Sequence, residues 1–193
     1  MYRQIVLASS SPYRRELLKK LGLNFKCDSP DIEESTQKNE TPEQLVKRLA
    51  IEKAHAVATR HSNALIIASD QAALLNNKIL GKPGDHHTAT QQLADASGNK
   101  VVFLTSLALL NTLTHTLQCE VVPYTVHFRT LHKAEIEAYL SKEKPYDCAG
   151  SFKSEGLGIT LFERLEGEDP NSLVGLPLIK LHKMLVNEGV SLY

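Results

Sequence analysis

Residues 4–18, QIVLASSSPYRRELL, decide the fold because they predict a strand, a turn and a helix start in direct succession. Residues 4–8 are apolar apart from Gln4 and predict a buried strand, and Ser9-Ser10-Ser11 is a turn. Pro12 suits the first position of a helix, where its missing N–H would have no partner in any case. A strand that leads directly into a helix is typical of α/β folds.

The same turn predicts an anion site. Three serine hydroxyls (residues 9–11) and the unpaired N–H groups of the first helical turn lie beside the guanidinium groups of Arg14 and Arg15. This combination suits phosphate oxygens by charge and by bidentate geometry. For this segment alone, a serine-capped helix with solvated arginines is the alternative.

The composition is that of a globular protein. The chain has 193 residues, of which 42% are hydrophobic and 23% charged, and its 22 basic and 22 acidic side chains balance. This length predicts a single domain over residues 1–193 or two closely joined lobes. Zero net charge argues against a general affinity for nucleic acid or membranes. With three widely spaced cysteines, no CxxC pair and no secretory or membrane-spanning run, we expect a cytoplasmic protein.

Strands and helices alternate in the first half of the chain, and a long hairpin with a helix fills the middle. This order predicts an α/β fold with a mixed central sheet, flanking helices and a cleft between two lobes. The predicted strands are 24–27, 64–68, 78–81, 100–111 and 118–130, with a further strand at the end of 147–161, and the predicted helices begin near 42, 88, 133 and 178.

Asp70 follows the apolar strand 64–68, with Lys53 on the preceding helix and Lys82 after the next turn. Ligands of open α/β sheets collect beyond the carboxyl ends of strands, where Ser9 and Arg14 also fall. Hydrolysis of a phosphate ester or phosphoanhydride needs a carboxylate to take a proton or hold a cation, and positive groups to neutralise phosphoryl oxygens. Taken singly, the aspartate could cap a turn and the lysines could be solvated.

Six motifs follow one another along nearly the whole chain, at residues 7–15, 31–34, 52–54, 69–71, 81–83 and 175–177. In order and spacing they resemble the Maf family of nucleoside triphosphate pyrophosphatases. The resemblance implies an inosine-triphosphatase-like fold with a strongly twisted mixed sheet and two lobes around a cleft. It also implies cleavage between the α- and β-phosphates of a nucleoside triphosphate, clearance of noncanonical nucleotides, and a possible homodimer.

The resemblance also assigns roles to residues. The proton acceptor falls on Asp70, the catalytic lysines on Lys53 and Lys82, and the phosphate-binding residues on Ser9 and Arg14. A divalent cation, Mg²⁺ or Mn²⁺, is implied, with Asp70 and the loop residue Glu34 as its ligands. Glu33 stands where the family usually has aspartate, which leaves its share in metal binding open.

Three departures point to a subfamily. Members resembling dTTP and UTP pyrophosphatases carry other residues at the positions of Tyr13, Gln71 and Glu155, and the present set resembles 7-methyl-GTP pyrophosphatases. Methylation at N7 puts a positive charge on guanine, so Tyr13 could stack on it by cation–π attraction. Glu155 could accept from N1–H and the exocyclic amine, a donor pair that thymine and uracil lack.

Two alternatives remain open from the sequence. One keeps the reaction but takes dTTP or UTP as the substrate. The other is a nucleotide-binding regulator, for example of cell division, with little turnover. A nucleotide panel separates them.

Overall fold

The computed structural model describes residues 3–193 and agrees with most of the predicted elements. The short helix at Pro170–Val174 and the 3₁₀ helices at Ala149–Ser151 and Leu157–Leu161, which the sequence did not predict, are additions, and the strand expected at the end of 147–161 begins only at Phe162. In chain order the elements are β1 (Gln4–Leu7), α1 (Pro12–Lys19), β2 (Phe25–Cys27), α2 (Pro42–Ala58), β3 (Ala64–Leu75), β4 (Lys78–Leu80), α3 (His86–Ala96), β5 (Lys100–Asn111), β6 (Leu117–Phe128), α4 (Lys133–Glu143), the 3₁₀ helices η1 (Ala149–Ser151) and η2 (Leu157–Leu161), β7 (Phe162–Gly167), α5 (Pro170–Val174) and α6 (Leu178–Asn187).

The strands within residues 3–193 form one seven-stranded sheet in the order β2-β1-β3-β5-β6-β7, with β4 paired to β3. The pairs β1–β2 and β1–β3 are parallel, whereas β3–β4 and β6–β7 are antiparallel. The predicted α/β class with a mixed central sheet and flanking helices is therefore confirmed.

The chain groups into two compact units. The first unit comprises the described residues of Met1–Gln71 together with Thr105–Val122 and Gly175–Tyr193, and the second unit comprises Ala72–Leu104 and Pro123–Val174. The cleft and the single domain over residues 1–193 stay predictions.

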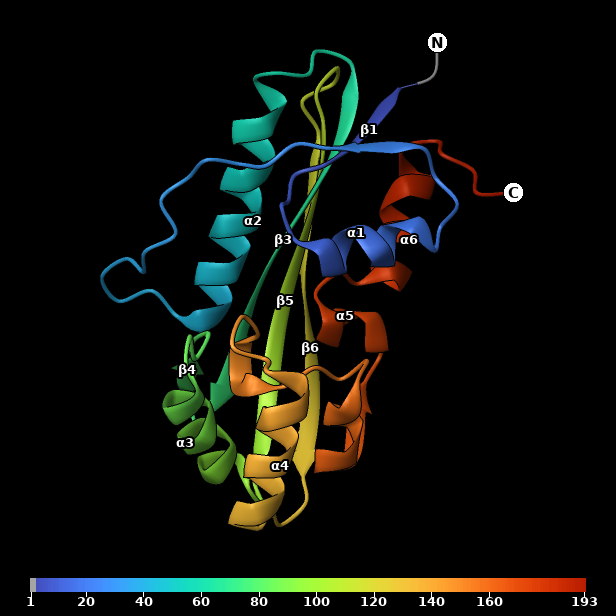
Figure 1. Cartoon of the computed structure of the whole chain (residues 1–193). Helices are drawn as coiled ribbons and strands as arrows, with labels where there is room; N and C mark the ends of the chain where they lie inside the picture. The colour runs from blue at the N-terminus through green and yellow to red at the C-terminus, as the bar shows by residue number, and fades with distance from the viewer. Residues whose placement is uncertain (1–2) are drawn as a thin grey trace. The chain divides into compact units, whose positions relative to one another are not determined.

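In the first unit, α2 covers one face of the sheet (Figure 1). Ala50, Ala54 and Val57 of the helix pack with small and branched side chains of β1, β3 and β5 in one buried cluster. The helix begins at Pro42, as predicted, with a capping box in which the Thr41 hydroxyl accepts from the Gln44 N–H and the Gln44 side chain accepts from the Thr41 N–H. The cap sets where α2 begins, and its apolar face sets which side of the helix packs against the sheet.

The core of the second unit is aromatic. Phe152 makes edge-to-face contacts with Phe103, Phe128 and Phe162 at ring-centroid distances of 5.4, 5.5 and 4.9 Å. The helices α3 and α4 lie against each other beside this core (Figure 1).

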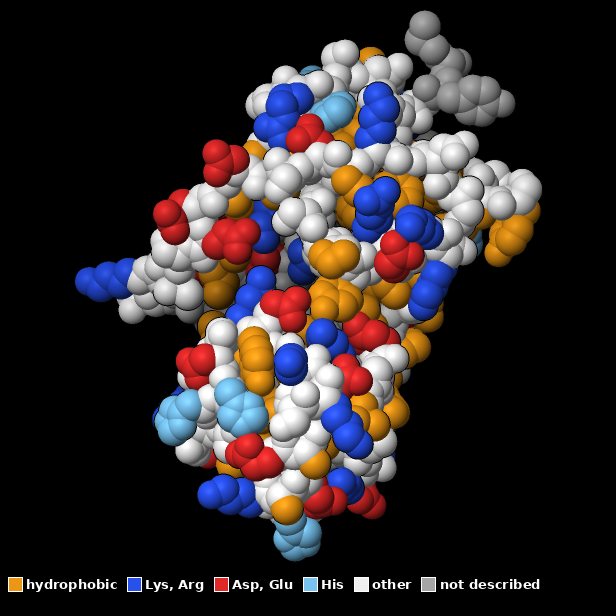
Figure 2. Space-filling model, in the orientation of Figure 1, with side chains coloured by type: hydrophobic (Ala, Val, Ile, Leu, Met, Phe, Trp, Pro, Cys, Tyr) orange, Lys and Arg blue, Asp and Glu red, His pale blue; other side chains and the backbone are white. Residues whose placement is uncertain are grey.

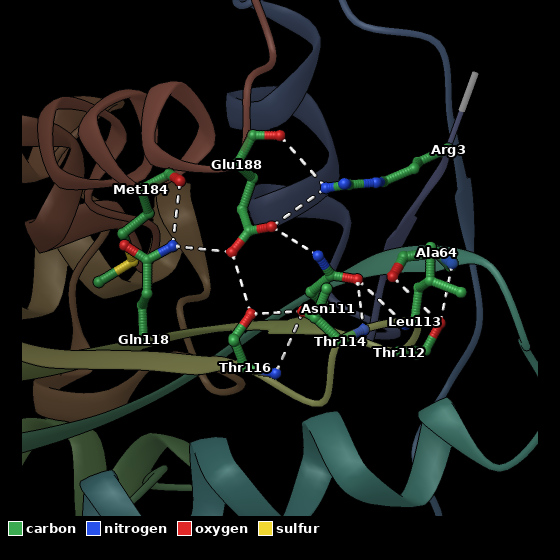
Figure 3. A network of polar contacts seen from close by, with 10 residues as sticks. All are labelled: Arg3, Ala64, Asn111, Thr112, Leu113, Thr114, Thr116, Gln118, Met184 and Glu188. Atoms are coloured by element: carbon green, nitrogen blue, oxygen red, sulfur yellow. Dashed lines mark hydrogen bonds and ion pairs between the residues drawn. The ribbon is translucent and has the colours of Figure 1, made fainter. Parts of the chain in front are cut away.

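Within the first unit, a polar network around Glu188, the residue that follows α6, connects distant parts of the chain (Figure 3). The Glu188 carboxylate accepts from Arg3 Nη1 at 3.1 Å, from the buried Asn111 Nδ2 at 2.6 Å and from Thr116 Oγ1 at 3.2 Å. These bonds connect the residue before β1, the end of β5 with the turn that follows it, and the end of α6.

The prediction that Asp70 follows the end of a strand was wrong. β3 runs to Leu75, so Asp70 lies inside it. The parallel pairing with β1 ends at Leu7↔Ile67, and the distal part of β3 pairs instead with β4. Asp70 therefore lies just beyond the parallel part of the sheet, although its own strand continues.

Asp28 joins the end of β2 to the residues after α2. Its carboxylate accepts from Arg60 Nη2 at 2.8 Å and lies 2.8 Å from His61 Nε2. The hydrogen bonds from Arg60 and His61 lower the pKa of Asp28 to about 2.

We expect the Asp28→Asn variant to be less stable than the parent protein at pH 7. Because the pKa of Asp28 is lowered by folding, its stabilising effect is present above the ordinary value near 4 and is lost as the pH falls towards 2. Urea unfolding at several pH values checks this. A stability difference that stays constant from pH 7 to pH 3 would contradict the assignment.

None of the helices within residues 3–193 has the length and hydrophobicity of a membrane-spanning segment. Acidic and basic side chains are interspersed over the face drawn in Figure 2, in keeping with the balanced charge of the chain.

Candidate functional site

Lys53 lies at the centre of a charged cluster in the first unit. It is only 5% exposed, and its Nζ lies 2.5 Å from Asp70 Oδ1 and 2.8 Å from Glu34 Oε1. Lys53 is buried because of its place in α2. Leu49, Ala50 and Val57 lie three or four residues from it and are on the same buried face of the helix. One ammonium group thus brings together two of the predicted carboxylates.

The loop that carries Glu34 is bound to α2 by a second ion pair. Arg48 Nε donates to Glu40 Oε1 at 2.6 Å, and Arg48 Nη2 donates to the Ser35 carbonyl at 3.0 Å. The hydrogen bond from Arg48 lowers the pKa of Glu40 to about 2. Glu33 points elsewhere, since its Oε1 accepts from the Ser35 N–H at 3.0 Å.

Ser106 of β5 holds the backbone of Asp70. The Asp70 N–H donates to Ser106 Oγ at 3.0 Å, and the Ser106 hydroxyl donates to the Val46 carbonyl of α2 at 2.6 Å. Ser106 is fully buried, so these groups cannot exchange their hydrogen bonds for water. The hydroxyl therefore joins the strand that carries Asp70 to the helix that carries Lys53.

Arg14 projects from the first turn of α1, and its Nε donates to the Gly175 carbonyl at 2.9 Å. Burial lowers the pKa of Arg14, and the negative charges of Asp70 and Glu34 oppose that shift. The guanidinium group stays charged in proteins and therefore contributes a positive charge near the two carboxylates.

The start of α1 has the predicted form. Ser11 is the N-cap, its hydroxyl accepts from the Arg14 N–H at 3.4 Å, and Pro12 opens the helix. The largely buried Ser9 accepts from the Ser11 N–H at 3.1 Å through its Oγ. Ser9 and Arg14 therefore flank the same helix start, and their role in binding an anion stays a prediction.

The residues predicted to select the base are divided between the units. Tyr13 is half-buried on α1, and Gln71 Nε2 donates to Thr105 Oγ1 at 2.9 Å, all in the first unit. Glu155 is exposed in the second unit and accepts from Ser154 Oγ at 3.2 Å. Lys82 is also an exposed residue of the second unit. The roles of these residues stay predictions.

The carboxylates of Glu34 and Asp70 suit a magnesium ion by chemistry. Among the residues that the structure describes, no group of three or more His, Cys, Asp or Glu side chains could hold a metal. Mg²⁺, however, is commonly bound by one or two carboxylates together with substrate phosphates and water. The pair that meets at Lys53 supplies that number of oxygen ligands.

Sequence reasoning missed Ser106, and although Ser69 and Gly175 lie in two of the motifs, it did not find the contact between them. Ser69 is fully buried and its hydroxyl donates to the Gly175 carbonyl at 2.9 Å, the same oxygen that receives Arg14. The sequence does show that Ser69 is a small polar residue next to Asp70. It does not show which distant carbonyl oxygen accepts the hydrogen bond of the Ser69 hydroxyl.

Comparison with known proteins gives consistent results. Residues 4–188 match the model of a family described as Maf-like protein. Three relatives bear the name 7-methyl-GTP pyrophosphatase. They come from Pseudomonas syringae pv. tomato (58% identical over 97% of both chains), Alcanivorax borkumensis (59% identical over 97% of this chain and 95% of the relative) and Pseudomonas aeruginosa (56% identical over 97% and 98%). The solved Staphylococcus aureus Ham1 protein covers 65% of this chain and 72% of its own at 17% identity, and its TM-score of 0.47 is too low to support an inference.

Proposed function

The chain belongs to the Maf family, and on this premise we propose that it hydrolyses 7-methyl-GTP to 7-methyl-GMP and pyrophosphate. Relatives with 56–59% identity over nearly their full length carry the name of this activity. The observation that carries the proposal is the buried Lys53 with Asp70 and Glu34 on its ammonium group. Such an enzyme would clear a noncanonical nucleotide from the cell.

In the proposed reaction, Asp70 accepts a proton from a water molecule whose oxygen attacks the α-phosphorus. The bond from the α-phosphorus to the oxygen that bridges to the β-phosphorus breaks, and pyrophosphate leaves with that electron pair. Lys53, 2.5 Å from Asp70, orients the carboxylate. Lys53, Lys82 and Arg14 neutralise the charge on phosphoryl oxygens, and Ser9 binds phosphate beside Arg14.

A divalent cation, Mg²⁺ or Mn²⁺, would be held by Glu34 and Asp70 and would supply Lewis-acid activation of the water and charge neutralisation. Asp70 and Glu34 therefore have two roles in the proposal. They bind Lys53 in the structure, and they provide the oxygen ligands that such an ion prefers.

Base selection is assigned to Tyr13, Gln71 and Glu155. The Tyr13 ring would stack on the cationic 7-methylguanine, and Glu155 would accept from its N1–H and amine. Gln71 follows Asp70 in β3 and is held by its hydrogen bond to Thr105 of β5. We also propose a cytoplasmic location, a homodimer and a single catalytic domain over residues 1–193, all from family membership.

A panel of nucleotides tests the proposal. Pyrophosphate release from 7-methyl-GTP, GTP, dTTP and UTP is measured with Mg²⁺, with Mn²⁺ and without metal. We expect kcat/KM for 7-methyl-GTP to exceed that for dTTP and UTP by about 10-fold or more. Thymine and uracil lack the N1–H and amine donors, so with these bases the Glu155 carboxylate would be left without its hydrogen bonds. A preference for dTTP or UTP would overturn the substrate assignment. Nucleotide binding without pyrophosphate release under any condition would overturn the proposed enzymatic activity and favour a nucleotide-binding regulator.

A further inference from the structure

The carbonyl oxygen of Gly175 is the acceptor for two side chains of the first unit. Arg14 Nε and Ser69 Oγ each donate to it at 2.9 Å. A carbonyl oxygen has two lone pairs, so the two donors together satisfy it. Three segments that are distant in sequence thereby meet at one atom: the start of α1, the middle of β3 and the residues before α6.

The backbone conformation at residue 175 requires glycine. Its φ is +121°, a conformation that residues with a side chain rarely adopt, and an added Cβ would lie 3.4 Å from Arg14 Nε. The carbonyl therefore sits on a stretch of chain that is both unusual in conformation and in close contact with the arginine.

The contact at Nε sets the direction of the Arg14 guanidinium group. Within residues 3–193, no hydrogen bond or ion pair involves either Nη of this arginine. The Nε edge is thus held by protein, and both Nη groups remain to donate. A guanidinium group held in this way can present its two Nη groups as a fork to phosphate oxygens.

We propose that Ser69 is a positioning residue for phosphate binding, acting on Arg14 through the Gly175 carbonyl. Ser69 is fully buried and precedes Asp70 in β3, so its hydroxyl also fixes Gly175 relative to the strand that carries the proposed base. The inference rests on the proposed function in one respect, namely that Arg14 binds substrate phosphate.

The first test is steady-state kinetics with 7-methyl-GTP. We expect Ser69→Ala to raise KM by about 5-fold with kcat within about 2-fold, because misplaced phosphate binding affects ground state and transition state alike. Ser69→Thr keeps the hydroxyl and is expected to restore KM. Thr112→Val is the matched control, since the Thr112 hydroxyl also joins two backbone segments, through the Ala64 N–H and carbonyl at the other end of β3. We expect it to leave KM unchanged.

A double-mutant cycle separates positioning from a general loss of structure. In an Arg14→Ala background, Ser69→Ala is expected to change KM by less than about 1.5-fold, because the group on which it acts is gone. Additive effects of the two substitutions would overturn the proposal, as would a fall in kcat at constant KM.

Titration calorimetry with inorganic pyrophosphate keeps this test separate from the proposed reaction. If no nucleotide is turned over, the proposed function fails, but the positioning role can still be tested. Ser69→Ala must then weaken pyrophosphate binding by about 5-fold in the parent protein, and it must have no such effect in the Arg14→Ala background. Equal affinity in parent and Ser69→Ala, or no pyrophosphate binding by the parent, would overturn the positioning role.

Discussion

Replacement of Asp70 by asparagine is expected to lower kcat for the preferred nucleotide by about 100-fold or more. The amide has nearly the same shape as the carboxylate but cannot take a proton from water. The backbone contact with Ser106 does not depend on the side chain, so β3 keeps its position. We therefore expect KM to change much less than kcat. Pyrophosphate release at saturating nucleotide measures the effect.

Asp95→Asn is the matched control for Asp70→Asn. Asp95 is an exposed residue of α3 whose carboxylate accepts from Gln91 Nε2 at 2.8 Å, so the substitution removes the same charge away from the proposed base. Activity should be unchanged. If Asp70→Asn retains turnover within about 3-fold of the parent, Asp70 is not the proton acceptor.

Local patterns in the sequence were sufficient for most of the fold. The apolar run before Ser9, the capping box at Thr41 and the long paired strands each carry a strong short-range signal, and all are present in the structure. The extent of β3 was misjudged because polar Ser69, Asp70 and Gln71 interrupt its apolar pattern. Pairing of the later part of β3 with β4 continues the strand through these residues, and that is a tertiary effect.

The charged residues of the candidate site could be predicted from the sequence, but the backbone carbonyls that hold their neighbours in place could not. The spacing of Lys53 from Leu49 and Val57 places it on the buried face of α2, and a lysine there requires anionic partners. The partners of Ser69, Ser106 and Arg14 include backbone carbonyls of Gly175 and Val46. Every residue has a carbonyl, so no side-chain pattern in the sequence identifies which one accepts.

The substitution Lys53→Met is expected to reduce kcat by about 100-fold and also to destabilise the protein. Methionine fills a similar volume without the charge, so the Asp70 and Glu34 carboxylates lose the ammonium group that lies between them. Asp70 is largely buried, with a side chain 14% exposed, and loss of its partner there costs about 3 kcal/mol in the free energy of unfolding. Kinetics at saturating nucleotide and urea unfolding in metal-free buffer measure the two effects.

Lys47→Met on the same helix distinguishes a local from a general electrostatic effect. Lys47 is exposed, so its removal changes the net charge by the same amount without touching the cluster around Lys53. If activity depended on the overall positive charge of α2, both variants would lose turnover to a similar degree. Because a charge within a few ångströms of a buried carboxylate acts through a lower effective dielectric than a solvated one, we expect only Lys53→Met to be impaired. Equal losses in the two variants would contradict a specific role for Lys53 beside Asp70.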